Sequence, residues 1–150
     1  MPATATAIPL VLALIAGIMV AVQAPTNAIL AKASGSPVVA AFISFLVGTF
    51  ALGALVATTS GRIFAPGLRD VPWYAWVGGL YGAVFVAVAA FAAPRIGVGV
   101  LLTAAIAGQL LAAVILDHFG VFGLPRQPVN LTRIAGVVLV LAGAVLVRKG

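Results

Sequence analysis

Two side-chain amides lie close together in the first apolar stretch of the chain. Gln23 and Asn27 are four residues apart, so a helix places both on one face, with Met19 one turn earlier on the same stripe. Pro25 removes a backbone donor between them and leaves the Ala21 carbonyl without its usual partner. Polar groups in hydrocarbon need hydrogen-bonding partners. We interpret Gln23 and Asn27 as the lining of a substrate cavity, the alternative being that both amides bond to neighbouring helices.

A third amide occurs near the middle of a later apolar stretch. Gln109 follows Gly108 in a run that has few other polar residues. It is therefore our second candidate position for hydrogen bonding to a substrate. We expect Tyr81 and Met19 to supply an aromatic and an apolar wall beside these amides.

Asp117 is followed directly by His118, the one place in the sequence where an acidic residue and a histidine are adjacent. An acid beside an imidazole can sense pH or control a loop, so gating or proton coupling is one interpretation. The alternative is a solvated turn residue, because a glycine-containing loop follows and no basic partner for Asp117 is evident. No ionisable residue lies at the middle of an apolar stretch, so the membrane carboxylate typical of proton-coupled exporters is missing from the sequence.

The remaining composition excludes several kinds of chemistry. The chain has no cysteine, one histidine and two acidic residues, a set that excludes thiol chemistry and makes no convincing metal site. An enzyme acting on lipids would need an activated nucleophile or a carboxylate pair, so we expect neither enzymatic activity nor a cofactor. The 8 basic residues are scattered at the ends of segments. That distribution is typical of interface anchoring and unlike a patch that binds nucleic acid.

Membrane helices must position these side chains. Hydrophobic residues make up 64% of the chain and charged residues only 7%, with a mean hydropathy of +1.30. A bilayer core about 30 Å thick needs roughly 20 apolar residues per helix. The sequence predicts an all-helical, single five-helix transmembrane domain over residues 1–150, with the first run a span and not a cleaved signal. The predicted spans are 8–31, 37–59, 72–93, 97–116 and 131–147, and the third break between them is expected at Pro94 and Arg95.

The basic residues divide evenly between the two faces that these spans define. The amino-terminal face holds Arg62, Arg69, Arg126 and Arg133, and the opposite face holds Lys32, Arg95, Arg148 and Lys149, which is four against four. The positive-inside rule then gives no preferred orientation. An odd number of spans with balanced charge predicts insertion both ways and an antiparallel homodimer. A weak bias that fixes one orientation is the alternative.

Glycines at helical spacing predict where helices pack closely. Gly78 and Gly82 lie in the third span, and Gly136 and Gly143 lie seven residues apart in the fifth. Small residues let neighbouring backbones approach one another in a membrane. We expect these four glycines to face another helix, either within the chain or across a dimer.

Several segments carry a resemblance to a known family. They are Gln23-Ala24-Pro25-Thr26-Asn27-Ala28, Pro94-Arg95-Ile96-Gly97-Val98, Gly108-Gln109-Leu110, Leu116-Asp117-His118-Phe119-Gly120-Val121-Phe122-Gly123 and Gly136-Val137-Val138-Leu139-Val140-Leu141-Ala142-Gly143. With these segments the chain resembles the short YdcZ-like branch of the drug/metabolite transporter superfamily over essentially its whole length. The resemblance implies a bacterial inner-membrane protein that forms, as an antiparallel pair, the ten-helix fold of longer relatives with two inverted repeats. Related four-helix multidrug resistance proteins carry a glutamate in their first helix, which this chain lacks.

Together these observations predict a transporter of small molecules, with export by alternating access in a dual-topology homodimer. Its expected partners are a small-molecule substrate, the lipid bilayer and a second copy of the chain, with a paralogous subunit as an alternative to the second copy. The competing hypothesis from another class is a membrane scaffold or regulatory subunit that does not itself transport. Such a protein would use the glycine seams and need no polar cavity.

Overall fold

The computed structural model describes residues 3–59 and 66–149, and every regular element in these ranges is a helix. Arg62, which enters the charge count above, lies outside the described residues. The long helices are joined by short turns or by loops that contain brief 3-10 helices. The elements in chain order are α1 (Ala3–Ser34), α2 (Pro37–Thr59), η1 (Pro66–Asp70), η2 (Trp73–Val77), α3 (Gly78–Ile96), α4 (Val98–Phe119), η3 (Val121–Gly123) and α5 (Leu131–Lys149).

Five helical segments are long and apolar enough to cross a membrane, which confirms the predicted all-helical class. Several run past the predicted carboxyl ends of the spans, to Ser34, Ile96 and Phe119. Hydropathy marks where hydrocarbon ends, whereas backbone hydrogen bonding continues the helix into the polar interface. The segments are Ile8–Ser34, Pro37–Thr59, Trp73–Ile96, Val98–Phe119 and Leu131–Lys149.

The break between the third and fourth spans lies at Gly97, and the expectation of a break at Pro94 and Arg95 is wrong. Both residues belong to the last turn of α3. There Pro94 removes only the bond to the Ala90 carbonyl, and few later turns depend on it. Gly97 has φ 79° and ψ 152°, a conformation that is open to glycine and costly for other residues. The chain therefore ends one helix and begins the next at the residue that tolerates this geometry.

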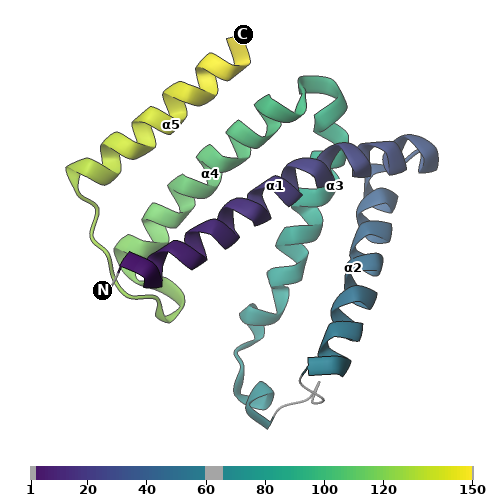
Figure 1. Cartoon of the computed structure of the whole chain (residues 1–150), viewed down its shortest axis with the longest axis horizontal. Helices are drawn as coiled ribbons and strands as arrows, with labels where there is room; N and C mark the ends of the chain where they lie inside the picture. Colours follow the sequence, from purple (N-terminus) through teal and green to yellow (C-terminus); the bar gives the residue numbers. More distant parts are fainter. Residues whose placement is uncertain (1–2, 60–65, 150) are drawn as a thin grey trace. The chain divides into compact units, whose positions relative to one another are not determined.

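The chain divides into two compact units, of which Met1–Arg95 is the first. Within it α1 and α2 contact one another and are joined by a short turn (Figure 1). Its buried residues are almost all alanines, whose small size lets helices approach closely. They lie toward the end of the unit where α1 ends, α2 begins and α3 ends. The buried residues are Ala24, Asn27, Ala40, Ala41, Val86, Ala89, Ala90 and Ala93.

The second unit, Ile96–Gly150, is a pair of helices. α4 and α5 lie next to one another, and the loop that connects them crosses one end of the pair (Figure 1). Leu101 and Ala107 of α4 are its buried residues among those described. So small a core cannot by itself hold two helices together in water, whereas a bilayer satisfies their apolar surfaces directly.

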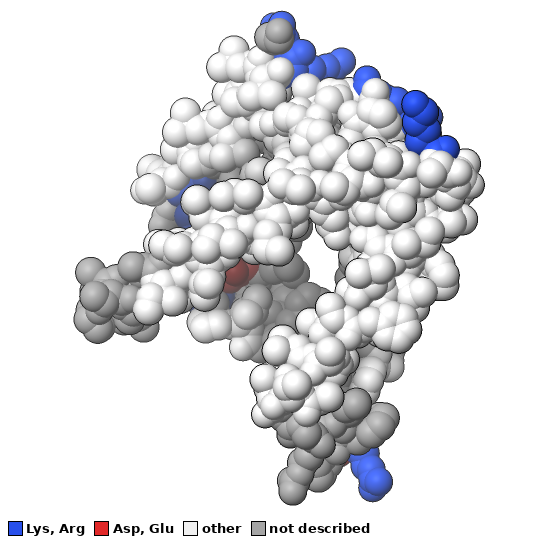
Figure 2. All heavy atoms as spheres, turned by 45° about the vertical axis from the view of Figure 1, so that its right-hand side comes forward, with Lys and Arg blue, Asp and Glu red and all other residues white. Residues whose placement is uncertain are grey.

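Most apolar side chains of both units are exposed. At most 17% of the residues in any of the five apolar segments are buried. Figure 2 shows uncharged atoms along the helices, and the charged residues Lys32, Arg95 and Arg148 lie in last turns of helices. A helix that is apolar all round is typical of a membrane span. The exposed surface is suited to lipid or to another transmembrane chain.

Candidate functional site

A groove between α1 and α2 contains the first of the predicted substrate residues. Gln23 contributes an amide from α1, and α2 contributes two hydroxyls at Ser44 and Thr49. The Thr49 hydroxyl donates to the Phe45 carbonyl of its own helix at 2.8 Å. Gln23 and Ser44 make no side-chain hydrogen bond to any described residue, so their polar atoms are available in the groove. The groove has a volume of about 200 Å³ and is lined by Gln23, Ser44, Phe45, Gly48, Thr49 and Leu52.

Asn27 lies in the alanine-rich interior of the first unit, one turn beyond Gln23. Its exposed fraction is 3%, the same as that of Ala24 one turn earlier. The Asn27 Nδ2 has no hydrogen-bond partner among the described residues. An unsatisfied buried donor costs about 1–3 kcal/mol. Asn27 is thus a buried, unused donor next to the groove and is not one of the residues that line it.

The other predicted substrate residues are exposed. Met19 on α1 is 68% exposed and Tyr81 on α3 is 70% exposed. Gln109 is exposed near the midpoint of α4, and its amide bonds to no described residue. Gln23 and Asn27 lie one turn apart on α1. Gln109 belongs to the second unit and the other four residues to the first.

Of the four glycines predicted to pack against another helix, Gly82 shows a close approach. A Cβ atom at Gly82 would lie 3.2 Å from Cζ of Phe45, so the phenyl ring of α2 rests on the backbone of α3 there. A Cβ atom at Gly78, Gly136 or Gly143 would meet no described atom within 4 Å. Contact of these three glycines with a second chain stays a prediction.

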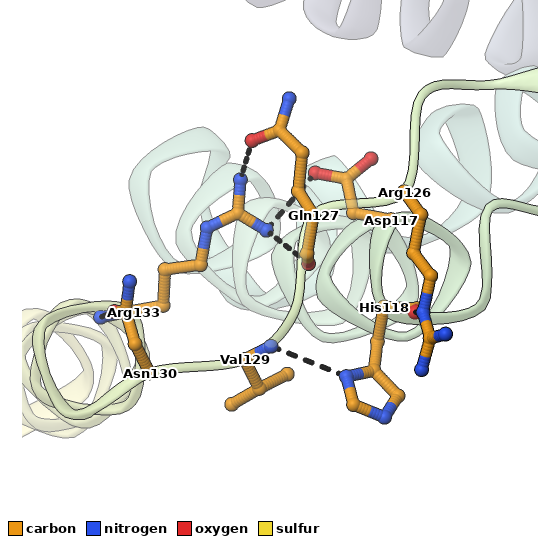
Figure 3. A network of polar contacts seen from close by, with 7 residues as sticks. All are labelled: Asp117, His118, Arg126, Gln127, Val129, Asn130 and Arg133. Carbon is orange, nitrogen blue, oxygen red and sulfur yellow. Dashed lines mark hydrogen bonds and ion pairs between the residues drawn. The ribbon is translucent and has the colours of Figure 1, made fainter.

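Asp117 has a basic partner, contrary to what the sequence indicated. Arg133 Nη1 lies 3.3 Å from Asp117 Oδ2 in an ion pair that joins α4 to α5 (Figure 3). The same nitrogen donates to the Gln127 carbonyl at 3.2 Å, and Arg133 Nη2 donates to Gln127 Oε1. The Asp117 and Arg133 side chains are 34% and 28% exposed. Asp117 therefore joins two helix ends through Arg133 and is not an isolated solvated carboxylate. We call the contacts among Asp117, Gln127 and Arg133 the clasp.

His118 holds the connecting loop from the other side of the same helix end. Its Nδ1 accepts a hydrogen bond from the Val129 N–H at 3.2 Å, and its carbonyl accepts one from Arg126 Nε at 3.0 Å (Figure 3). Because Nδ1 is the acceptor, the neutral ring carries its proton on Nε2. The Gln127 N–H also donates to the Asp117 carbonyl at 2.8 Å. These bonds fold the loop back against the last turn of α4.

Asn130 begins α5 and fixes the position of Arg133. Its Oδ1 accepts the Arg133 N–H at 2.9 Å, and its carbonyl accepts the Ile134 N–H at 3.0 Å, which is the geometry of an amino-terminal cap. The sequence contained a signal for this arrangement. An asparagine before an apolar run predicts a cap, and opposite charges at the facing ends of two consecutive helices predict an ion pair.

Within the described ranges, no three side chains of the His, Cys, Asp or Glu types gather in one place. The chemistry that this part of the chain offers is hydrogen bonding by uncharged amides and hydroxyls in an apolar setting, with one clasp of charged groups at a helix end. Such groups can bind and release a molecule without changing it.

Comparisons with known proteins agree with this description. Searches of curated proteins and of solved structures found no match to the chain. A family model matches residues 8–146, which covers all five apolar helices except a few terminal residues. The model's description is "Putative inner membrane exporter, YdcZ". With five apolar helices and this match, the chain is a multi-pass membrane protein of the transporter type, and it belongs to the YdcZ family of the drug/metabolite transporters.

Proposed function

We propose that the chain exports small neutral, zwitterionic or amphipathic molecules across the bacterial inner membrane. The observation that supports this most directly is the groove between α1 and α2, where the Gln23 amide and the Ser44 hydroxyl have no partner in the described chain. Uncharged hydrogen-bonding groups in an apolar groove suit a substrate without a strong net charge. Asn27, Tyr81 and Met19 of the first unit and Gln109 of the second are the further residues that we propose for substrate binding.

The proposed transporter is a pair of chains. Gln109 presents a free amide near the middle of α4, about 16 Å from either helix end by the rise of 1.5 Å per residue. A polar side chain at that depth is unfavourable against hydrocarbon and is stabilised by polar partners. A second copy would cover this face and bring a second set of amides to the centre.

The balanced charge supports an antiparallel arrangement of the two copies. Inverted copies resemble the inverted repeats of longer transporters, which place substrate at the repeat interface and expose it alternately by rocking. In this scheme the Asp117 and His118 contacts at the end of α4 act as a gate, closing the α4–α5 loop in one state and releasing it in the other.

A second candidate function is a scaffold or regulatory subunit that binds another membrane protein. A groove of about 380 Å³ between α2 and α3 favours it, because apolar side chains alone line this groove. A transmembrane helix would fit against such a surface without polar contacts. The lining residues are Val38, Ala41, Phe42, Phe45, Ala83, Val84 and Ala87.

Efflux from proteoliposomes separates the two functions. Vesicles containing the purified chain are loaded with a defined mixture of neutral and zwitterionic metabolites, and release is followed by mass spectrometry. We expect release above that of protein-free vesicles and, for Gln23→Ala, a rate about fivefold lower, the factor for one hydrogen bond of about 1 kcal/mol.

The matched control is Val22→Ala, which changes the neighbouring residue, a side chain that is 58% exposed. Its rate should equal that of the wild type. A Gln23→Ala rate equal to that of the wild type contradicts the site. Absence of release with every member of the mixture favours the scaffold.

A further inference from the structure

A groove between α4 and α5 differs from the two described above because an ion pair closes one end of it. Its walls are one face of each helix, spaced by three and four residues, and its volume is about 350 Å³. Six of its eight lining residues are apolar. The lining residues are Leu110, Ala113, Val114 and Asp117 of α4 and Arg133, Gly136, Val137 and Val140 of α5.

The charged end of this groove lies where headgroups would be. Asp117 is in the last turn of α4 and Arg133 is in the first turn of α5, so both belong to the ends of apolar helices. From Asp117 to Leu110 the groove runs about 10 Å into the apolar part of the pair by the rise per residue. A molecule that fills it therefore has a polar head and an apolar tail.

The ion pair has both donors and an acceptor left over. An arginine carries five N–H donors, and Arg133 makes three bonds, to Asp117 Oδ2, the Gln127 carbonyl and Gln127 Oε1. Two of its donors have no partner among the described residues. Asp117 Oδ1 likewise accepts no hydrogen bond there. Both side chains are about one third exposed and both line the groove.

We propose that this groove binds one acyl chain of a bilayer phospholipid with an ethanolamine headgroup. The lipid phosphate accepts hydrogen bonds from the unused donors of Arg133, and the ammonium group donates to Asp117 Oδ1. The pair has no net charge, which suits a zwitterion better than an anionic headgroup. A choline headgroup has no N–H and cannot make the bond to Asp117. Gly136 leaves the groove floor open, since a Cβ there would meet nothing within 4 Å.

Another groove lined by α4 and α5 provides an internal comparison. It holds about 430 Å³, and Arg148 is its single charged lining residue. With a cation and no carboxylate, it lacks the acceptor that would distinguish an ammonium group from a quaternary amine. Gly108 lines this groove, so Gly108→Leu fills it in the way that Gly136→Leu fills the groove of the ion pair.

Native mass spectrometry of the purified full-length chain tests the proposal. The protein in detergent is mixed with equal amounts of phosphatidylethanolamine, phosphatidylcholine and phosphatidylglycerol that carry identical acyl chains. We expect ethanolamine adducts to exceed choline adducts about tenfold, the factor for one charge-assisted hydrogen bond. Asp117→Asn keeps an oxygen for Arg133 but removes the charge, and should bring the ratio close to one. Gly136→Leu should do the same, whereas Gly108→Leu should leave the ratio unchanged.

Circular dichroism and thermal unfolding compare each variant with the wild type. They establish that a variant is folded before its ratio of ethanolamine to choline adducts is interpreted. Equal ethanolamine and choline adducts on the wild type would overturn the proposal. So would a preference that survives in Asp117→Asn. If Gly136→Leu alters the fraction of dimer and leaves the lipid ratio as it was, a second chain and not a lipid occupies the groove.

Discussion

Asp117, His118 and Arg133 show how much a few residues contribute at the end of a helix pair. The side chains and backbone carbonyls of Asp117 and His118 together accept hydrogen bonds from five residues of the following segment, which are Gly120, Arg126, Gln127, Val129 and Arg133. An exposed ion pair by itself contributes about 0–1 kcal/mol, so the clasp depends on the network as a whole. A gate built from these groups would have to exchange several bonds at once.

The buried amide of Asn27 leads to a prediction at the same scale. Asn27→Leu removes a buried donor that has no partner among the described residues and places apolar atoms at a position that is 3% exposed. We expect the free energy of unfolding in detergent to rise by about 1 kcal/mol, because the desolvation cost of the amide disappears. If Asn27 also binds substrate, efflux from proteoliposomes should fall about fivefold in the same variant.

Thr26→Val is the control for Asn27→Leu, because the Thr26 hydroxyl bonds only to carbonyls of its own helix. Thr26→Val should change neither the free energy of unfolding nor the efflux rate appreciably. A loss of stability in Asn27→Leu would show that the amide has a partner in the native assembly.

The helices themselves depend on local chemistry at their ends. α1 continues through Pro9 and Pro25, and α3 contains Pro94, so proline does not mark the ends of these helices. In a bilayer the alternative to a helix is an unsatisfied backbone, so neighbouring turns tolerate the loss of one bond. The ends are instead set by glycines with positive φ, such as Gly97 and Gly120, and by the Asn130 cap.

The cap of α5 should be measurable. Asn130→Ala removes the acceptor for the Arg133 N–H and should lower the free energy of unfolding by about 1 kcal/mol. Asn130→Asp keeps an oxygen at the helix amino terminus and should retain the wild-type value. Denaturant titration in detergent measures both. Equal losses in the two variants would mean that the side-chain oxygen does not act as a cap.

The connection between α3 and α4 gives a second prediction for an element. Gly97→Ala places a side chain at φ 79° and ψ 152° and should destabilise the protein by about 1–3 kcal/mol. Gly99→Ala, two residues later, is the control. A Cβ at Gly99 would make an ordinary contact of 3.8 Å with Val147, and alanine favours the helix. Thermal unfolding of the two variants should therefore shift in opposite directions, and a Gly97→Ala variant as stable as Gly99→Ala would contradict this geometry.

The described part of the molecule has few buried residues, and the basic residues of the sequence divide evenly between the two predicted faces. Nine hydrophobic residues make up the buried apolar set of the described chain, and five of its helices are apolar enough to span a bilayer. The exposed apolar surfaces of such helices need to be covered by lipid or by another chain. The proposed antiparallel pair would supply that second chain, and its balanced charges permit both orientations.

Orientation can be shifted by charge alone. The double variant Arg148→Gln and Lys149→Gln leaves two basic residues on the carboxyl-terminal face against four on the other. The positive-inside rule then places the carboxyl terminus outside the cytoplasm in every copy. Two reporters fused there, one active only in the cytoplasm and one only outside, should both be active on the wild type, and only the second on the variant.

The same variant tests the antiparallel pair. Its efflux should be lost when expressed alone and return when it is expressed with the opposite double variant, Arg62→Gln and Arg69→Gln, which leaves the contacts of Arg126 intact. A wild-type chain for which one reporter alone is active would rule out the antiparallel homodimer, and a lone variant that retains full efflux would argue for a single orientation.

The sequence by itself determined the class of the protein and the number of its spans. Hydropathy over about 20 residues is a local property, and the bilayer requires every such run to be a helix. Family membership also follows from residues read in order, such as the run from Leu116 to Gly123. The exact helix ends were less predictable, because helices continue past the hydrocarbon boundary until a backbone conformation such as that of Gly97 stops them.

The tertiary structure decided which polar groups have partners. Gln23 and Asn27 share a helical face by sequence, yet packing leaves the Gln23 side chain in a groove and buries that of Asn27, which is 3% exposed. Arg133 is 16 residues from Asp117, and only the folded loop brings the two within 3.3 Å. Such contacts join positions far apart in the chain. Opposite charges at consecutive helix ends favour an ion pair, but its geometry depends on the path of the loop and the packing of the helices, neither of which residue spacing encodes.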